Sequence, residues 1–117
     1  MSDQDCLFCK IINGNAAADV VFQDNRCIVI SDINPQAPTH VLVIPHEHME
    51  SLDEASQKDE LLLGHLLRVA AKVANERGLS DGGGYRTVIN TGSGAGQSVF
   101  HLHIHVLGGR ELAWPPG

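Results

Sequence analysis

The feature that most constrains the fold is the alternation of histidine and aliphatic residues in HLHIHVL, at positions 101–107. Successive side chains of a β-strand point to opposite faces, so this alternation predicts a strand. One face would carry three aliphatic side chains, which suits a core, and the other face would carry the three histidines. The aliphatic residues are Leu102, Ile104 and Val106, and the histidines are His101, His103 and His105.

Three imidazoles in a row indicate a functional site. Titratable rings placed side by side repel one another when protonated, so stability alone explains the row poorly. Same-face positions lie about 6.5–7 Å apart along a strand, so one compact metal site cannot easily hold all three rings. At least one of the three is therefore expected to have a different role.

Length and charge bound the class of protein. The 117 residues are enough for one domain of ordinary size, taken here as residues 1–117. Lys and Arg number 8 against 14 Asp and Glu, giving a formal net charge of −6, so no nucleic acid polymer and no acidic membrane surface is expected as a partner. The apolar runs are too short to span a membrane and the N-terminus lacks a signal-peptide pattern, so we expect a cytoplasmic protein.

Periodicity and turn residues predict an α+β fold. Helices are expected at residues 4–13 and 56–77, where apolar residues recur every three or four positions. Runs of strand-forming residues predict strands at 20–23, 27–31, 40–45, 85–90 and 101–107. This order suggests an antiparallel sheet of about five strands, with the two helices on one face.

The glycine-rich loop TGSGAGQS, at 91–98, leads into the histidine strand. Its glycines would let backbone amides approach a phosphate, and Ser98 would place a hydroxyl near the histidines. Glycine spacing alone is a weak signal, because such loops are more often flexible turns. Neutral imidazole is a nucleophile toward phosphorus, and its ordinary pKa of about 6.5 leaves it largely unprotonated at neutral pH. The combination suggests phosphoryl or nucleotidyl transfer.

The three cysteines cannot all pair, so a disulfide framework is not expected in a cytosolic chain. Cys27 lies in an apolar run and is expected in the core. The C-x-x-C spacing of Cys6 and Cys9 indicates either metal binding with distant histidines or a redox pair at the start of a helix.

HLHIHVL resembles the H-φ-H-φ-H-φ-φ signature of the histidine triad family of nucleotide hydrolases and transferases, most closely its Hint branch. The similarity covers nearly the whole chain, including SDINPQAPTHVLVIP at 31–45, GYRTVINTG at 84–92, GQSVFHLHIHVLGGR at 96–110 and the final WPPG. It implies five antiparallel strands with two helices. It also implies a homodimer that pairs through helix and strand into a continuous larger sheet.

By matching position, the resemblance implies hydrolysis of purine nucleoside 5′-phosphoramidates, such as adenosine 5′-phosphoramidate, to AMP and an amine. His103 would attack the α-phosphorus and form a nucleotidyl-histidine, which water then hydrolyses. His105 would hydrogen-bond the phosphate, Ser98 would assist the departing amine, and His40 would support the site. Asp32 would accept the ribose hydroxyls, and the other substrate-binding residues would be Phe8, Ile33, Asn90, Gly96, Gln97 and Trp114, the last reaching toward the partner subunit's site.

The resemblance also implies a structural zinc site, because some bacterial histidine triad proteins and galactose-1-phosphate uridylyltransferases hold zinc at matching positions. The ligands would be Cys6, Cys9, His48 and His101. Two thiolates and two imidazoles form a closed tetrahedral site, so this zinc would not be needed for the chemistry.

Three other functions remain open from the sequence. The same nucleotidyl-histidine chemistry could cleave dinucleoside polyphosphates. The H-x-H pair, with His40 as a third ligand, could hold a catalytic zinc whose bound water is the nucleophile. A nucleotide-binding regulatory module would use the same pocket, with hydrolysis incidental.

Overall fold

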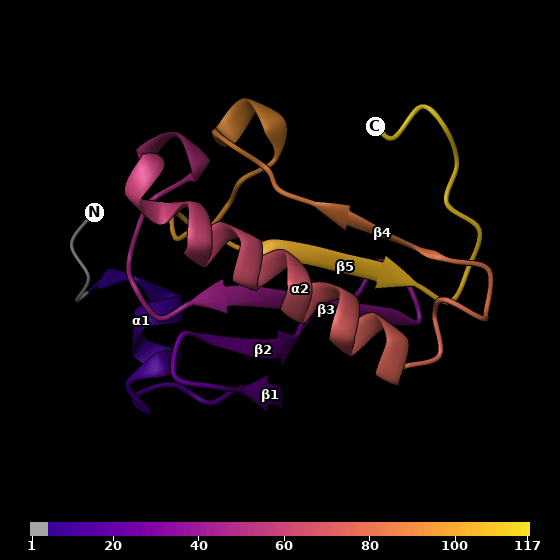
Figure 1. The fold of residues 1–117 in the computed structure, drawn as a ribbon, viewed down its shortest axis with the longest axis horizontal. Coiled ribbons are helices and arrows are strands. Elements are labelled where there is room, and N and C mark those ends of the chain that lie inside the picture. Colours follow the sequence, from indigo (N-terminus) through magenta and orange to yellow (C-terminus); the bar gives the residue numbers. More distant parts are fainter. Residues whose placement is uncertain (1–4) are drawn as a thin grey trace.

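The computed structural model describes residues 5–117 and confirms the α+β fold, with five strands and two α-helices in that part of the chain. The helices are α1 (Leu7–Ile12) and α2 (Glu60–Glu76). The strands are β1 (Val20–Gln23), β2 (Cys27–Ser31), β3 (Thr39–Pro45), β4 (Tyr85–Val88) and β5 (Ile104–Gly108). Figure 1 shows α2 lying across one face of the sheet, with β1 and β4 at its two edges.

The sheet is antiparallel throughout, in the order β1-β2-β3-β5-β4. β1 and β2, at the strands predicted for 20–23 and 27–31, form a hairpin, whose turn is held by Asp24 Oδ1 accepting the backbone N–H groups of Arg26 and Cys27 at 2.8 Å each. β5 pairs with β4 on one side and with β3 on the other. The histidine strand therefore lies in the interior of the sheet.

The two helices cover opposite faces of the sheet, so the prediction that they share one face is wrong. Val41 and Val43 of β3 pack in the core beneath α2, whereas Leu42 and Ile44 pack with Phe8 of α1. β2 and β3 are continuous apolar runs, CIVIS and THVLVIP, and a strand of that kind needs cover on both faces.

The histidine segment keeps its predicted alternation, although β5 begins at Ile104 and not at His101. Leu102 N–H donates to the carbonyl of Met49 at 2.7 Å, so this part of the chain pairs with the loop after β3. Leu102 and Ile104 still lie in the core beneath α2. The predicted division of aliphatic and histidine side chains between two faces is therefore confirmed.

Both helix starts are defined by side chains. Cys6 caps α1, its Sγ accepting the Cys9 N–H at 3.4 Å. Ser56 and Asp59 form a capping box before α2, as their spacing suggests. His65, on α2, contacts Asp24 with 2.7 Å between Nε2 and Oδ2, so it joins the helix to the hairpin turn. Burial acts to raise the pKa of Asp24, but its hydrogen bonds outweigh burial and lower the pKa to about 2.

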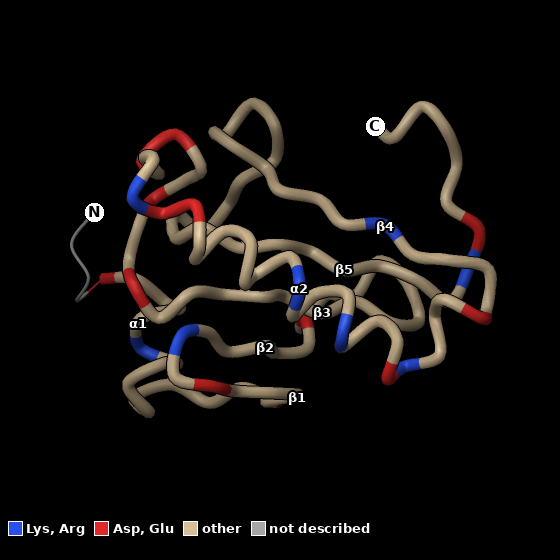
Figure 2. Tube along the Cα trace, in the orientation of Figure 1, with Lys and Arg blue, Asp and Glu red and all other residues tan. Residues whose placement is uncertain are grey.

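Acidic residues are concentrated in the segment between β3 and the start of α2 (Figure 2), at Glu47, Glu50, Asp53, Glu54, Asp59 and Glu60. Among the residues described, no helix has the length and apolar character needed to cross a membrane.

The core is apolar and includes Cys27, which is fully buried as expected. Burial beside Asp24 raises the pKa of the Cys27 thiol to about 12.

The core beneath α2 sets a first prediction. Leu66 is fully buried, so Leu66→Ala should lower the free energy of unfolding by about 3–5 kcal/mol through lost apolar burial and the cavity left behind. The matched change Leu52→Ala, at a side chain 38% exposed, should cost less than about 1 kcal/mol. Urea denaturation measures both values, and equal losses would contradict this assignment of the core.

Candidate active site

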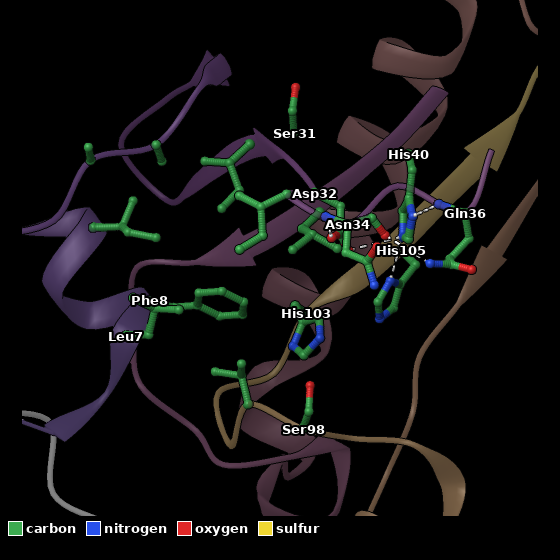
Figure 3. A pocket seen from close by; sticks show the side chains of 17 residues that line it. Leu7, Phe8, Ser31, Asp32, Asn34, Gln36, His40, Ser98, His103 and His105 are labelled. Atoms are coloured by element: carbon green, nitrogen blue, oxygen red, sulfur yellow. Dashed lines mark hydrogen bonds and ion pairs between the residues drawn. The ribbon is translucent and has the colours of Figure 1, made fainter. Parts of the chain in front are cut away.

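A pocket of about 480 Å³ lies on the sheet face that α1 covers. Figure 3 shows its two ends, with Phe8 on one side and His40 and His105 on the other, and His103 between them. The structure brings seven of the predicted site residues to its wall, namely Phe8, Asp32, Ile33, His40, Ser98, His103 and His105. These residues come from α1, from the loop after β2, from β3, and from the segment that ends in β5.

His103 is held in one tautomer. Its Nδ1 lies 2.7 Å from the carbonyl oxygen of His101, which can only accept, so Nδ1 carries the proton. Neutral His103 therefore has its lone pair on Nε2. The ring is 6% exposed and meets Phe8 edge-on, with 5.1 Å between ring centroids. These contacts orient an unprotonated imidazole nitrogen at a pocket that can admit a ligand.

The rings of His40 and His105 contact each other through their nitrogen atoms. The Gln36 backbone N–H donates to His40 Nδ1 at 3.0 Å, so neutral His40 carries its proton on Nε2. That nitrogen lies 2.9 Å from His105 Nδ1 and 3.3 Å from Asp32 Oδ2. If His40 donates to His105 Nδ1, the proton of neutral His105 is on Nε2. His105 can then donate a hydrogen bond while His103 supplies a lone pair.

All three pocket histidines favour the neutral form. Burial lowers the pKa of His40 and of His103. The Asp32 carboxylate partly offsets this for His40, and the hydrogen bond to the His101 carbonyl together with Asp32 partly offsets it for His103. Burial, together with the neighbouring His103 and His40, lowers the pKa of His105 to about 4. At neutral pH the pocket therefore presents uncharged imidazoles, as nucleophilic attack requires.

The side of the pocket next to α1 is apolar. Its walls are Leu7, Phe8, Ile11, Ala17, Ala18, Ile30, Leu42 and Val99. Polar groups, including Asp32, Asn34, Gln36 and Ser98, line the pocket around the histidines. The pocket therefore suits a ligand in which a flat apolar group is joined to a polar or charged group.

Four predicted substrate-binding residues do not line the pocket. Gln97 is buried behind it, where its side chain accepts from Gly92 N–H at 2.9 Å and donates to the Glu50 and Val99 carbonyls at 2.6 and 3.1 Å. Gly96 adopts a φ of +99° beside the Asn90 side chain. These residues shape the loop that presents Ser98. Trp114, in the C-terminal tail, is 81% exposed.

Sequence reasoning missed several wall residues. Asn34 and Gln36 lie in the loop after β2, between the strands predicted at 27–31 and 40–45, and the sequence alone indicated no role for these two residues. Ala17, Ala18 and Ile30 line the apolar side, where they lack any chemical signature in the sequence. Only the packing of α1 against β2 and β3 makes them neighbours of the pocket.

The predicted metal ligands Cys6, Cys9, His48 and His101 come together, with one donor atom from each within 4.8 Å of the others. Cys6 Sγ lies 3.3 Å from His101 Nδ1, Cys9 Sγ lies 3.3 Å from His48 Nδ1, and the two Nδ1 atoms are 3.1 Å apart. Ordinary Zn–N and Zn–S bonds give separations of roughly 3.3–3.8 Å in a tetrahedron. The three separations lie at or slightly below the short end of this range, so the donor set fits zinc.

A contact behind the cluster orients one of its ligands. His101 Nε2 lies 2.8 Å from the Pro45 carbonyl and so carries the proton, which leaves the Nδ1 lone pair facing the sulfur atoms. Neutral, oriented imidazole is the form that binds a metal. The cluster is also separate from the pocket, because none of its four residues lines the pocket wall.

Fold and site together define a small α+β protein with paired imidazoles at an apolar pocket. Residues 5–112 match the family described as "Scavenger mRNA decapping enzyme C-term binding". A protein of Synechococcus elongatus, named as an uncharacterized HIT-like protein, is 52% identical over 114 residues, covering 97% of this chain and 98% of the relative.

Solved structures agree with this match. A HIT family hydrolase from Legionella pneumophila is 49% identical with a TM-score of 0.94, covering 97% of this chain and 100% of that one. A Zn-bound histidine triad family protein from Mycobacterium smegmatis is 32% identical with a TM-score of 0.78, covering 93% and 78%. The chain belongs to the histidine triad (HIT) family and has its hydrolase-type fold.

The lowered pKa of His105 predicts a pH-dependent stability. The unfolded histidine titrates near pH 6.5 and the folded one near pH 4, so the unfolded state binds more protons between these values. Stability is therefore complete above pH 6.5 and falls as the pH drops toward 4. Urea denaturation across this window should show a shallower pH dependence for His105→Asn than for the wild type at equal metal content. Identical slopes would contradict the assignment.

Proposed function

We propose that this chain hydrolyses purine nucleoside 5′-phosphoramidates, converting adenosine 5′-phosphoramidate to AMP and an amine. The HIT family binds nucleotide substrates, and one similar structure is that of a hydrolase. The observation that carries the proposal is the single tautomer of His103, whose Nδ1–H is held by the His101 carbonyl. This leaves Nε2 as a nucleophile beside a pocket of nucleotide size.

The chemistry proceeds in two displacements. His103 Nε2 attacks the α-phosphorus, a P–N bond to the histidine forms, and the P–N bond to the amine breaks. The Ser98 hydroxyl donates its proton to the amine as the amine leaves, and it regains a proton from the water that attacks in the second step. Water then attacks the same phosphorus, the bond to Nε2 breaks, and AMP leaves with neutral His103 restored. His105, with its proton on Nε2, donates to a phosphate oxygen and stabilises the charge that develops there.

The rest of the substrate follows the polarity of the pocket. The nucleobase lies on the apolar side with Phe8 and Ile33, and the Asp32 carboxylate accepts the ribose hydroxyls. Gln97 and Gly96 act through the loop conformation that places Ser98, because the Gln97 backbone N–H donates to the Gly92 carbonyl at 3.1 Å and its side chain accepts from the Gly92 N–H. Backbone amides after Gln97, such as that of Ser98, would face the phosphate. Asn90 supports the same loop beside Gly96.

Zinc is proposed as a structural group held by Cys6, Cys9, His48 and His101. When bound, it would cross-link α1 to the segment after β3, which carries His48, and to the segment before β5, which carries His101. The donor set and its separations support this assignment, as does the Zn-bound relative from Mycobacterium smegmatis. No chemical step depends on the metal, because the cluster lies behind the pocket wall.

A homodimer is also proposed, with β4 and α2 at its interface. β4 is an edge strand with one unpaired side, which could extend the sheet into a partner. On α2, Leu61 is 82% exposed and Leu67 is 49% exposed on either side of Gly64. Trp114, exposed in the tail, would then reach toward the partner subunit's pocket.

A metal-dependent hydrolase is the second candidate. The ligand set differs from the H-x-H pair with His40 that the sequence suggested, because Asp32 takes the place of His103: donor atoms of Asp32, His40 and His105 lie within 4.8 Å of one another, close enough to share an ion. Such an enzyme would use metal-bound water as its nucleophile, and His103 would be dispensable. Cleavage of dinucleoside polyphosphates would use the same His103 chemistry with a nucleotide as the leaving group.

The nucleophile prediction tests the first proposal. His103→Ala should reduce turnover of adenosine 5′-phosphoramidate by at least about 10³-fold and abolish an AMP adduct seen by mass spectrometry after an acid-free quench. His46→Ala, a histidine outside the pocket, is the matched control and should keep its activity. Turnover that survives His103→Ala but vanishes on metal removal would favour the metal-dependent hydrolase.

The dimer prediction concerns Leu61. Leu61→Glu would place a charge in the interface, so light scattering coupled to size-exclusion chromatography should show the mass falling from two chains to one. Leu52→Glu, at another exposed leucine away from α2, should leave the mass unchanged. A wild-type protein with the mass of a single chain would contradict the dimer.

A further inference from the structure

We propose that the cluster of Cys6, Cys9, His48 and His101, when it holds zinc, controls nucleotide affinity by clamping a wall of the pocket. The wall consists of Leu7 and Phe8, which lie between the two cysteine ligands. The inference rests on the proposed function, because this wall matters only if the pocket takes a nucleotide.

The sequence CLFC places two pocket residues directly between two ligands. Leu7 and Phe8 both line the pocket, while the flanking Cys6 and Cys9 belong to the cluster. Coordination of zinc by Cys6 and Cys9 would therefore restrain both ends of this short wall. No change in Leu7 or Phe8 themselves is needed for the metal to affect the shape of the pocket.

α1 is too short to hold this position by its own helical stability. It spans only six residues, Leu7–Ile12, and isolated helices of that length are unstable in water. Its attachments are a small apolar cluster with Ile28, Ile30, Leu42 and Ile44, and the cysteine–histidine cluster. The cysteine–histidine cluster is therefore one of two attachments that keep α1 on the sheet.

The other two ligands come from the chain around the central strands. His48 follows β3, and His101 precedes β5 and bonds the Pro45 carbonyl at 2.8 Å. Four bonds to one ion would thus join α1 to the most buried part of the sheet. Such a cross-link restrains α1 far more than contacts between thiols and imidazoles alone.

Phe8 lies between the cluster and the nucleophile. Its ring meets His101 edge-on, with centroids 5.9 Å apart, and meets His103 edge-on at 5.1 Å. The Phe8 side chain is 4% exposed and points toward His103 in Figure 3. When α1 loosens, this ring moves, and the nucleobase loses the aromatic surface against which it packs.

The expected effect is a change in affinity. Contact between an aromatic ring and a base contributes enough to binding that its loss should weaken AMP affinity roughly ten-fold. Isothermal titration with AMP should show this weakening in chelator-treated wild type against the zinc-loaded protein, with zinc content measured by mass spectrometry. Cys9→Ser should behave like the chelated form. Cys27→Ala, which changes the cysteine outside the cluster, should bind zinc and AMP normally.

Combining Phe8→Ala with zinc removal tests whether the metal acts through the Phe8 ring. In Phe8→Ala, AMP affinity should already be low, and removing zinc should lower it little further, because the ring through which the metal acts is gone. Equal AMP affinity of the zinc-loaded and metal-free wild type would overturn the inference. So would a zinc effect of full size in Phe8→Ala, or the absence of bound zinc.

Hydrogen exchange separates a local clamp from general unfolding. Zinc removal should expose the amides of α1 while those of β2 and β3 stay protected. Loss of protection throughout the sheet would overturn the clamp, since the metal would then hold the whole fold. If zinc-loaded protein fails to bind AMP, the nucleotide pocket itself is wrong. If it binds AMP but leaves phosphoramidates intact, the proposed chemistry fails while the clamp stands.

Discussion

The pairing of β3 with β5 at the centre of the sheet is the constraint on which the rest of the structure depends. Its register sets His40 opposite Leu107 and Leu42 opposite His105, and this brings the His40 and His105 rings within 2.9 Å at their nitrogen atoms. The same pairing leads the chain before β5 past the end of β3, where His101 reaches the Pro45 carbonyl. One ladder of backbone hydrogen bonds therefore positions both the pocket imidazoles and one of the metal ligands.

Backbone carbonyl and amide groups then decide what each imidazole can do. A carbonyl accepts from His103 Nδ1 and another accepts from His101 Nε2, while an amide donates to His40 Nδ1. Each contact selects one tautomer, so three rings of the same chemical type acquire different reactive nitrogens. Burial keeps the pocket rings neutral, and a nucleophilic imidazole must be neutral. The backbone partners select the tautomers without the need for further charged residues.

Much of the fold could be predicted because the local signals were strong. The strands at 20–23 and 27–31 lie where expected, and the helical periodicity before Arg77 matches α2 apart from a turn of 3-10 helix at its start. The side of the sheet that each helix covers was predicted wrongly. The continuous apolar runs of β2 and β3 held that information, since they need cover on both faces. Ala17, Ala18 and Ile30 could not be assigned to the pocket, because small apolar residues carry no signature of the cavity that they line.

The sequence by itself determined which reactive groups the protein contains and how they are spaced along the chain. The alternation in 101–107 separates imidazoles from core side chains, and the C-x-x-C of Cys6 and Cys9 provides two thiols one helical turn apart. Only the tertiary structure decided how these groups are divided. It sends His101 toward the cysteines and His103 and His105 toward the pocket, and it leaves Gln97 behind the pocket wall. The physical reason is that spacing along a strand sets which face a side chain occupies, whereas its partners come from segments distant in the chain, and only packing brings those segments together.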